Sequence, residues 1–346
     1  MKTMKYSPLA LLALTMAAPA HATDLEISGA IEVEAGFGSD YNKVKTSDIT
    51  LATVELAIDS KINDRVSGHL SLIHEEDDTP LEVDEGIISL DMGNGWNISA
   101  GQMYIPFGNY ESNMVSDPLT LQMGETRESA LQLGFERDGY HSAVYIFNGD
   151  SIETSTALNG EDTIEHFGVS IGKSFESDKF TLDVGLDYIS SIGDTDGIFG
   201  NLTAATDHDA DAATANISTL QSYVSGFAFH WIYNRDALSF IAEHVKSDSF
   251  QAAELAFKAQ GAAPSATNIE LGYAYDWGSA AIGYQTTDEA FSLGLPETRL
   301  LFSISHEIFE NTTLSYEHAM DDDYSVADGG TGKDGSTSTL QLAVAF

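Results

Sequence analysis

Carboxylates in this sequence are spaced so that they fall on one face of a β-strand. Glu32 and Glu34 alternate with the apolar Ile31 and Val33. Successive side chains of a strand point to opposite faces, so the carboxylates share one face and the aliphatic groups share the other. Charged side chains that line a water-filled passage select ions by their sign. By this alternation we expect the following side chains to line a lumen: Glu32, Glu34, Glu55, Asp59, Asp183, Asp187, Glu243, Glu270, Arg299 and Glu317.

A second group of polar side chains follows the strand-like segment WNISAGQMY (96–104). Pro106 removes a donor from any strand ladder, and Gly108 permits a bend. Alternation does not return until about Ser129, so we expect a loop over residues 105–128. Folded inward, this loop would narrow a pore; the alternative is a loop that covers only the outer rim. The candidates for a constriction are Tyr104, Pro106, Phe107, Gly108, Tyr110, Glu111, Asp117, Glu125, Arg127 and Glu128.

The sequence gives little support for catalysis or for a tight metal site. It contains no cysteine, which excludes disulfides and thiolate ligands, and its ten histidines include no HExxH pair. We therefore expect no enzyme, no resident metal and no cofactor. The acidic segments 74–79, 206–214 and 321–335 carry oxygen ligands, so loosely bound Ca²⁺ or Mg²⁺ is an alternative to simple hydration there. His208, which lies between two aspartates, is a weaker metal candidate.

The overall charge narrows the choice of partners. The chain has 15 basic and 54 acidic residues, a formal net charge of −39. Phosphate contacts need Lys and Arg, so nucleic acid is not an expected partner. Such a chain should attract cations instead. Its hydrophobic content of 42% is too high for a disordered chain.

The first 22 residues have the features of a secretory signal peptide. Lys2 and Lys5 precede an apolar run over 9–18, and the small residues Ala20 and Ala22 indicate cleavage after Ala22. We expect export and a mature chain of residues 23–346. No later stretch is apolar for eighteen residues, so no transmembrane helix is expected.

The elements that must position these side chains are strands. Short polar connections alternate with long ones, and an even number of strands with this asymmetry is typical of a bacterial outer-membrane β-barrel. A closed barrel pairs every backbone group in lipid, which an open sheet cannot do. Phe346 ends a final alternating strand, as in the assembly signal of such proteins; the alternative is an edge strand of a soluble β-sandwich. We expect an all-β, antiparallel, porin-like barrel of about sixteen strands, starting near residues 25, 49, 66, 83, 96, 130, 140, 165, 180, 221, 238, 268, 280, 298, 312 and 337.

Residues 101–135 also resemble one family of proteins. The strings GQ-x-Y-x-PFG, SDPLTL and GETRE in this stretch are similar to the central motif of the LbtU-type siderophore porins. The resemblance implies an outer-membrane barrel for passive uptake of ferric siderophore, independent of TonB, and assigns no individual binding residue. We also keep two alternatives: a general cation-preferring porin for small solutes, and a closed structural or adhesive barrel. The expected partners are ferric siderophore or another small solute, outer-membrane lipid and lipopolysaccharide; the oligomeric state is left open.

Overall fold

The computed structural model describes most of the chain. The described residues are 24–75, 81–153, 164–202, 218–258 and 260–346. The expected cleavage site after Ala22, His208, segment 206–214 and most of segment 74–79 lie outside them.

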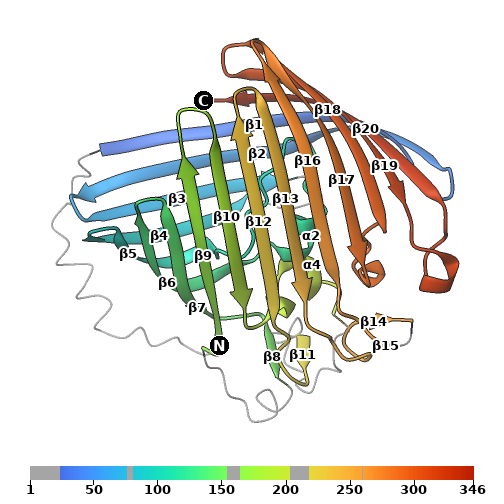
Figure 1. Ribbon diagram of the computed structural model, residues 1–346, viewed down its shortest axis with the longest axis horizontal. Coiled ribbons are helices and arrows are strands. Elements are labelled where there is room, and N and C mark those ends of the chain that lie inside the picture. The colour runs from blue at the N-terminus through green and yellow to red at the C-terminus, as the bar shows by residue number, and fades with distance from the viewer. Residues whose placement is uncertain (1–23, 76–80, 154–163, 203–217, 259) are drawn as a thin grey trace, which may run out of the picture.

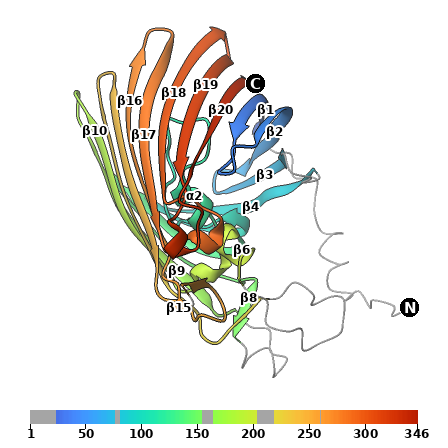
Figure 2. The same ribbon diagram turned by 90° about the vertical axis from the view of Figure 1, so that its right-hand side faces the viewer.

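Sixteen antiparallel strands form a closed barrel, which confirms the expected fold (Figures 1 and 2). The last strand pairs with the first, with Ala345 opposite Ala30, so the sheet has no free edge. The barrel strands are β1 (Asp24–Ser39), β2 (Lys45–Asn63), β3 (Val66–Glu75), β4 (Glu82–Gly93), β5 (Trp96–Tyr104), β6 (Arg127–Arg137), β7 (Tyr140–Phe147), β9 (His166–Glu176), β10 (Thr181–Ile189), β12 (Gly226–Arg235), β13 (Leu238–Ser247), β16 (Ser265–Tyr275), β17 (Gly278–Asp288), β18 (Thr298–Phe309), β19 (Thr312–Asp322) and β20 (Asp334–Ala345).

The two ends of the barrel differ in their connections. At one end the strands join through tight turns, such as Asn94–Gly95 and Asp138–Gly139, in which all four residues have positive φ. Such turns match the twist of paired strands and favour Asn, Asp and Gly. The other end carries the long connections. These hold the small pairs β8 (Ser151–Glu153) with β11 (Ser218–Leu220) and β14 (Ala256–Phe257) with β15 (Gln260–Gly261), and the helices α2 (Leu119–Gly124), η1 (Ile192–Asp194), α4 (Asp196–Phe199), η2 (Phe291–Leu293) and η3 (Val326–Asp328).

The strands present an apolar face outward and a mixed, largely polar face inward. In β18, Leu300 and Phe302 are exposed, whereas Leu301 and Ser303, which alternate with them, are buried. This alternation is the one expected for a sheet with lipid on one side and a lumen on the other. No helix in the described part of the chain is long and apolar enough to cross a membrane.

Some expected strand boundaries are wrong. β2, expected to start near residue 49, starts at Lys45, and β20, expected to start near residue 337, starts at Asp334. At Lys45–Asp48 the strand continues through four exposed polar residues, so pairing extends beyond the apolar alternation that marks it in the sequence. In the other direction, β12 starts at Gly226, later than the expected start near residue 221.

Candidate functional site: the loop between β5 and β6

The segment that leaves β5 and returns to β6 spans residues 105–126 and is here called loop 3. The expected range of 105–128 is too long, because Arg127 and Glu128 are the first residues of β6 and Tyr104 is the last of β5. The Ile105 amide donates to the Thr126 carbonyl at 3.0 Å, so the loop closes at its base. Ile105 and Phe107 are buried, which fixes this base in the interior.

Tyr110 packs between the first part of loop 3, at Gly108, and its last part, at Gly124. Its backbone has a φ of +60°, in the left-handed region, and its ring lies against Gly108 and Gly124. A Cβ on Gly108 would stand 2.3 Å from the Tyr110 ring, and one on Gly124 would stand 2.5 Å from the hydroxyl oxygen. Both positions therefore require glycine. Burial raises the pKa of Tyr110 well above its usual value.

Carboxylates of the barrel wall hold the first part of loop 3 through its backbone. The Gly108 amide donates to Asp187 at 3.1 Å, and the amides of Asn109 and Tyr110 donate to Glu243 at 2.7 and 3.2 Å. Hydrogen bonds with an ionised partner are stronger than neutral ones. Two side chains of β10 and β13 thus fix the direction in which the chain leaves β5.

The same pattern continues along the loop to strands farther around the barrel. Glu270 of β16 accepts from the Asn113 amide at 2.6 Å and from the Ser112 hydroxyl at 2.7 Å. Glu317 of β19 accepts from the Val115 amide and the Ser116 hydroxyl, both at 2.6 Å. The loop therefore lies against inward-facing side chains from β10 to β19, inside the barrel. Figures 1 and 2 show α2, the last part of this loop, within the ring of strands.

Helix α2 is fixed by a further set of inward groups. The Thr120 hydroxyl donates to the second oxygen of Glu243 at 2.7 Å, and the Leu119 amide donates to Gln285 at 3.3 Å. Gln285 in turn donates to Asn268, which donates to Glu270. Sequence reasoning missed Gln285 and Asn268, although both alternate inward like the carboxylates and that signal could have found them.

The residues expected to line the lumen have different partners in the structure. Asp187, Glu243, Glu270 and Glu317 accept hydrogen bonds from loop 3. Gln341 donates to Glu34 at 2.9 Å, and Asp59 contacts His69 at 2.8 Å. Asp183 contacts His141 at 3.0 Å and His230 at 2.8 Å. The space between loop 3 and the β1–β4 wall is here called the passage.

The two arginines among the candidates are paired with carboxylates. Arg127 binds Asp84 at 2.8 Å and Glu82 at 2.9 Å, and the Tyr104 hydroxyl donates to Asp84 at 3.0 Å. Arg299 makes two hydrogen bonds to Asp321, at 2.8 and 3.0 Å. Each guanidinium charge is therefore balanced by a local carboxylate. Glu128 is buried on the inner face of β6.

Loop 3 presents its remaining carboxylates where other acids lie nearby. Burial, followed by the charges of Asp196 and Asp117, raises the pKa of Glu125 to about 7. Burial raises the pKa of Asp117, and burial also raises that of Asp196 to about 6. The Asp196 amide of α4 donates to the Glu125 carbonyl at 3.0 Å, so α4 fixes the end of loop 3. The charge of Glu75 on β3 contributes to the Glu125 shift, which places acids on both sides of the passage.

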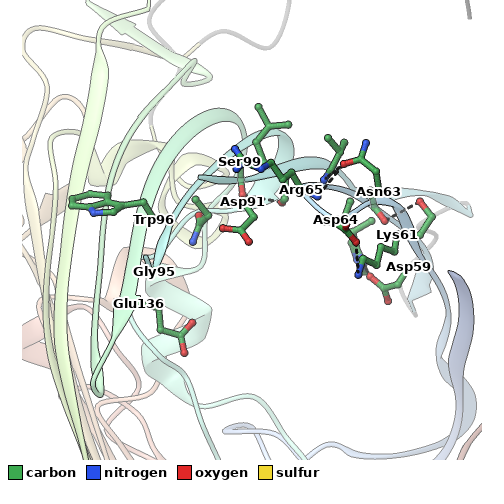
Figure 3. A pocket seen from close by; sticks show the side chains of 18 of the residues that line it. Asp59, Lys61, Asn63, Asp64, Arg65, Asp91, Gly95, Trp96, Ser99 and Glu136 are labelled. Atoms are coloured by element: carbon green, nitrogen blue, oxygen red, sulfur yellow. Dashed lines mark hydrogen bonds and ion pairs between the residues drawn. The ribbon is translucent and has the colours of Figure 1, made fainter. Parts of the chain in front are cut away.

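A wide vestibule of about 900 Å³ opens at the short-turn end (Figure 3). Asp59, Asp91 and Glu136 point into the opening from β2, β4 and β6, whereas Trp96 points away from it. Lys61 stands 3.6 Å from Asp64 at its edge. The vestibule is thus acidic, and Lys61 and Arg137 in its lining are paired with neighbouring aspartates.

The geometry gives little support for a serine nucleophile or for a metal site. The string GVSIG (168–172) has the spacing of a nucleophile elbow, which sequence reasoning overlooked, but Ser170 lies inside β9 rather than at a strand-to-helix turn. Among the described residues no group of three or more acids or histidines is placed to hold a metal ion. In segment 321–335, Asp334 pairs with Lys43 at 2.6 Å and Asp323 accepts from the Thr331 amide at 2.6 Å.

Sequence relatives of this chain are UPF0422 proteins. No protein-family profile matches it. It is 28% identical over 367 residues to a UPF0422 protein of Legionella pneumophila (strain Lens), with 93% of this chain aligned. It is 27% identical over 314 residues to a UPF0422 protein of Coxiella burnetii (strain RSA 493 / Nine Mile phase I), with 86% aligned. The chain spans 66% and 64% of the lengths of these two relatives.

Solved structures with the same fold are outer-membrane channels. The channel DcaP of Acinetobacter baumannii superposes with a TM-score of 0.64 at 13% identity, covering 95% of this chain and 99% of that one. An anion-selective porin from Comamonas acidovorans gives 0.63 at 9% identity, covering 93% and 99%. OmpF of Salmonella typhi, in complex with daunomycin, gives 0.62 at 12% identity, covering 93% and 97%. The chain therefore has the sixteen-stranded porin fold.

Proposed function

We propose that this protein is an outer-membrane channel for passive uptake of small solutes, with loop 3 as its constriction. The observation that carries the proposal is the set of hydrogen bonds from loop 3 to Asp187, Glu243, Glu270 and Glu317, which hold the loop against the inner wall of the barrel. A barrel of sixteen strands leaves an aqueous channel unless it is filled. The porin fold of the solved neighbours and the outward apolar face support this reading.

Cations are the favoured solutes of this channel. Asp117, Glu125 and Glu75 bring negative charge to both sides of the passage, and the arginines nearby are paired. Low-dielectric walls concentrate such a field and raise the local concentration of ions of the opposite sign. The solved porin of Comamonas acidovorans is described as anion-selective, so the shared fold leaves the sign of selectivity to the side chains.

Ferric siderophore is the proposed specific cargo, on the resemblance of residues 101–135 to the LbtU-type porins. In the structure, several residues of that motif hold loop 3 in place. Ser116 binds Glu317, Pro118 precedes α2, and Gly124 accommodates Tyr110, so these residues seat loop 3. The resemblance thus supports a common loop architecture, and iron transport rests on a separate test.

Conductance tests the proposed channel, and iron uptake tests the proposed cargo. Purified protein in a planar lipid bilayer should give discrete conductance steps; a folded, inserted barrel without them would favour the closed structural barrel. A deletion strain should lose uptake of radiolabelled ferric siderophore and regain it with the intact gene. Restored permeation of small cations without restored iron uptake would favour the general porin.

A further inference from the structure

Small and polar side chains on the inner face of β16 and β17 accommodate loop 3. In the register of these strands Glu270 stands opposite Gly283, and Asn268 stands opposite Gln285. A Cβ on Gly283 would lie 2.9 Å from the terminal methyl group of Met114, so this glycine leaves room for the loop. Glu270 is therefore a charged anchor beside a space that loop 3 fills.

A chain of three hydrogen bonds runs along this part of the wall from α2 to Glu270. The Leu119 amide, at the start of α2, donates to Oε1 of Gln285 at 3.3 Å. Nε2 of Gln285 donates to Oδ1 of Asn268 at 3.3 Å, and Nδ2 of Asn268 donates to Oε1 of Glu270 at 2.9 Å. Gln285 and Asn268 are fully buried, so these bonds are shielded from water.

The two ends of the chain fix the direction of every bond in it. A backbone amide only donates, so Gln285 turns its oxygen to Leu119 and its amide nitrogen to Asn268. An ionised carboxylate only accepts, so Asn268 turns its nitrogen to Glu270 and its oxygen to Gln285. Reversal of either side-chain amide would leave buried donors or acceptors unpaired, which is costly.

Glu270 joins this chain to an earlier part of loop 3. Its Oε1 also accepts from the Ser112 hydroxyl at 2.7 Å, and its Oε2 accepts from the Asn113 amide at 2.6 Å. One carboxylate oxygen is thus shared between Ser112 and Asn268. Segment 112–113 and the start of α2 are therefore connected through the side chains of β16 and β17.

We propose that Asn268 and Gln285 are positioning residues that couple α2 to segment 112–113, so that both parts of loop 3 move together; this rests on the proposed role of loop 3 as the constriction. Hydrogen bonds in a buried network polarise one another, so the loss of one bond weakens its neighbours. A change at Gln285, which contacts α2, then loosens segment 112–113 on the far side of Glu270.

A spin label beside segment 112–113 tests this coupling. The chain has no cysteine, so Glu111→Cys takes a nitroxide label at an exposed position next to Ser112. Electron paramagnetic resonance separates mobile from immobile label, and heat-modifiable migration on gels verifies that each barrel is closed. In Gln285→Met, the ratio of mobile to immobile label should rise about tenfold, because an unpaired buried amide shifts an equilibrium by about that factor. An unchanged ratio would overturn the proposal.

An exchange of charge between neighbours separates this coupling from general damage to the wall. Asn268→Asp alone turns a carboxylate toward Glu270 and should also mobilise the label. In the double variant Asn268→Asp, Glu270→Gln, the carboxylate and the amide exchange places and the net charge is that of the parent. The amide at position 270 donates to the carboxylate at 268, so the label should become immobile again. A double variant as mobile as Asn268→Asp would contradict the coupling.

Asn97→Asp is the matched control, because it adds the same carboxylate to the inner wall on β5, beside the vestibule. The ratio should stay that of the parent. A tenfold rise in this control would mean that added lumen charge releases the loop, and the proposal would fall. The label reports loop 3 whether or not the barrel conducts, so a failure here is distinct from a failure of the proposed channel.

Discussion

Glu125 shows how a single carboxyl can report the electrostatics of the passage. Its pKa of about 7 lies above the ordinary 4.5, so between these values the native protein binds a proton that the unfolded chain does not. The contribution of Glu125 to the free energy of unfolding is therefore lost as the pH rises from about 4.5 to about 7. The same titration adds a negative charge to the lumen.

We expect the cation-to-anion permeability ratio to rise as the pH increases from 5.5 to 8.0. Glu125→Gln should reduce this rise, because the amide stays neutral. Asp196→Asn should shift the midpoint to lower pH, because it removes the largest charge that raises the Glu125 pKa. Reversal potentials in a KCl gradient measure the ratio. A Glu125→Gln channel with an unchanged pH profile would contradict this assignment.

Gly124 gives a second prediction at the scale of one residue. Gly124→Ala would place a Cβ 2.5 Å from the Tyr110 hydroxyl, so the two arms of loop 3 must separate. Overpacking of this kind costs about 1–3 kcal/mol, and here the loop should absorb it rather than the strand ladder. Conductance should rise while heat-modifiable migration on gels stays normal. Gly200→Ala is the control, since its nearest neighbour would be 3.8 Å away and its conductance should not change.

At the scale of elements, loop 3 depends on wall strands far from it in the sequence. Glu270 and Glu317 together hold four residues of the loop within the segment 112–116. In a double Glu270→Gln, Glu317→Gln variant, the stronger charge-assisted bonds become neutral, so we expect frequent current fluctuations in single-channel records. Glu55→Gln changes an inward carboxylate on β2 and should not increase the current fluctuations. Equal noise in both variants would mean that lumen charge, rather than loop anchoring, governs the fluctuations.

The strands were predictable from the sequence, because lipid contact imposes a two-residue period on β18 and its neighbours. The limits of β2 were not, since Lys45–Asp48 pair above the apolar band without alternating. Pro106 and Gly108 marked the end of β5 correctly. The wall carboxylates were found by alternation, but their hydrogen bonds to loop 3 depend on the tertiary course of that loop. The pairing of His141 and His230 through Asp183 depends on strand register, which a single sequence does not show.

At the scale of the whole molecule, the acidic chain should form a channel that prefers cations. The net charge of −39 is spread over a vestibule, a passage and long loops that are all acidic. In a tenfold KCl gradient, the reversal potential should have the sign of K⁺ permeation, and added salt should weaken the preference because it screens exposed charges. A preference for Cl⁻ would show that a basic cluster outside the contacts described above controls the field.

Single-channel conductance before and after shortening loop 3 tests the central claim most directly. Replacing residues 109–123 by a short Gly-Ser linker leaves the sixteen paired strands unchanged. If loop 3 is the constriction, conductance should rise at least about twofold, and larger solutes should permeate, because the narrowest section of the pore has widened. Heat-modifiable migration would verify that the barrel still closes. A properly closed barrel whose conductance is the same with and without the loop would contradict the account.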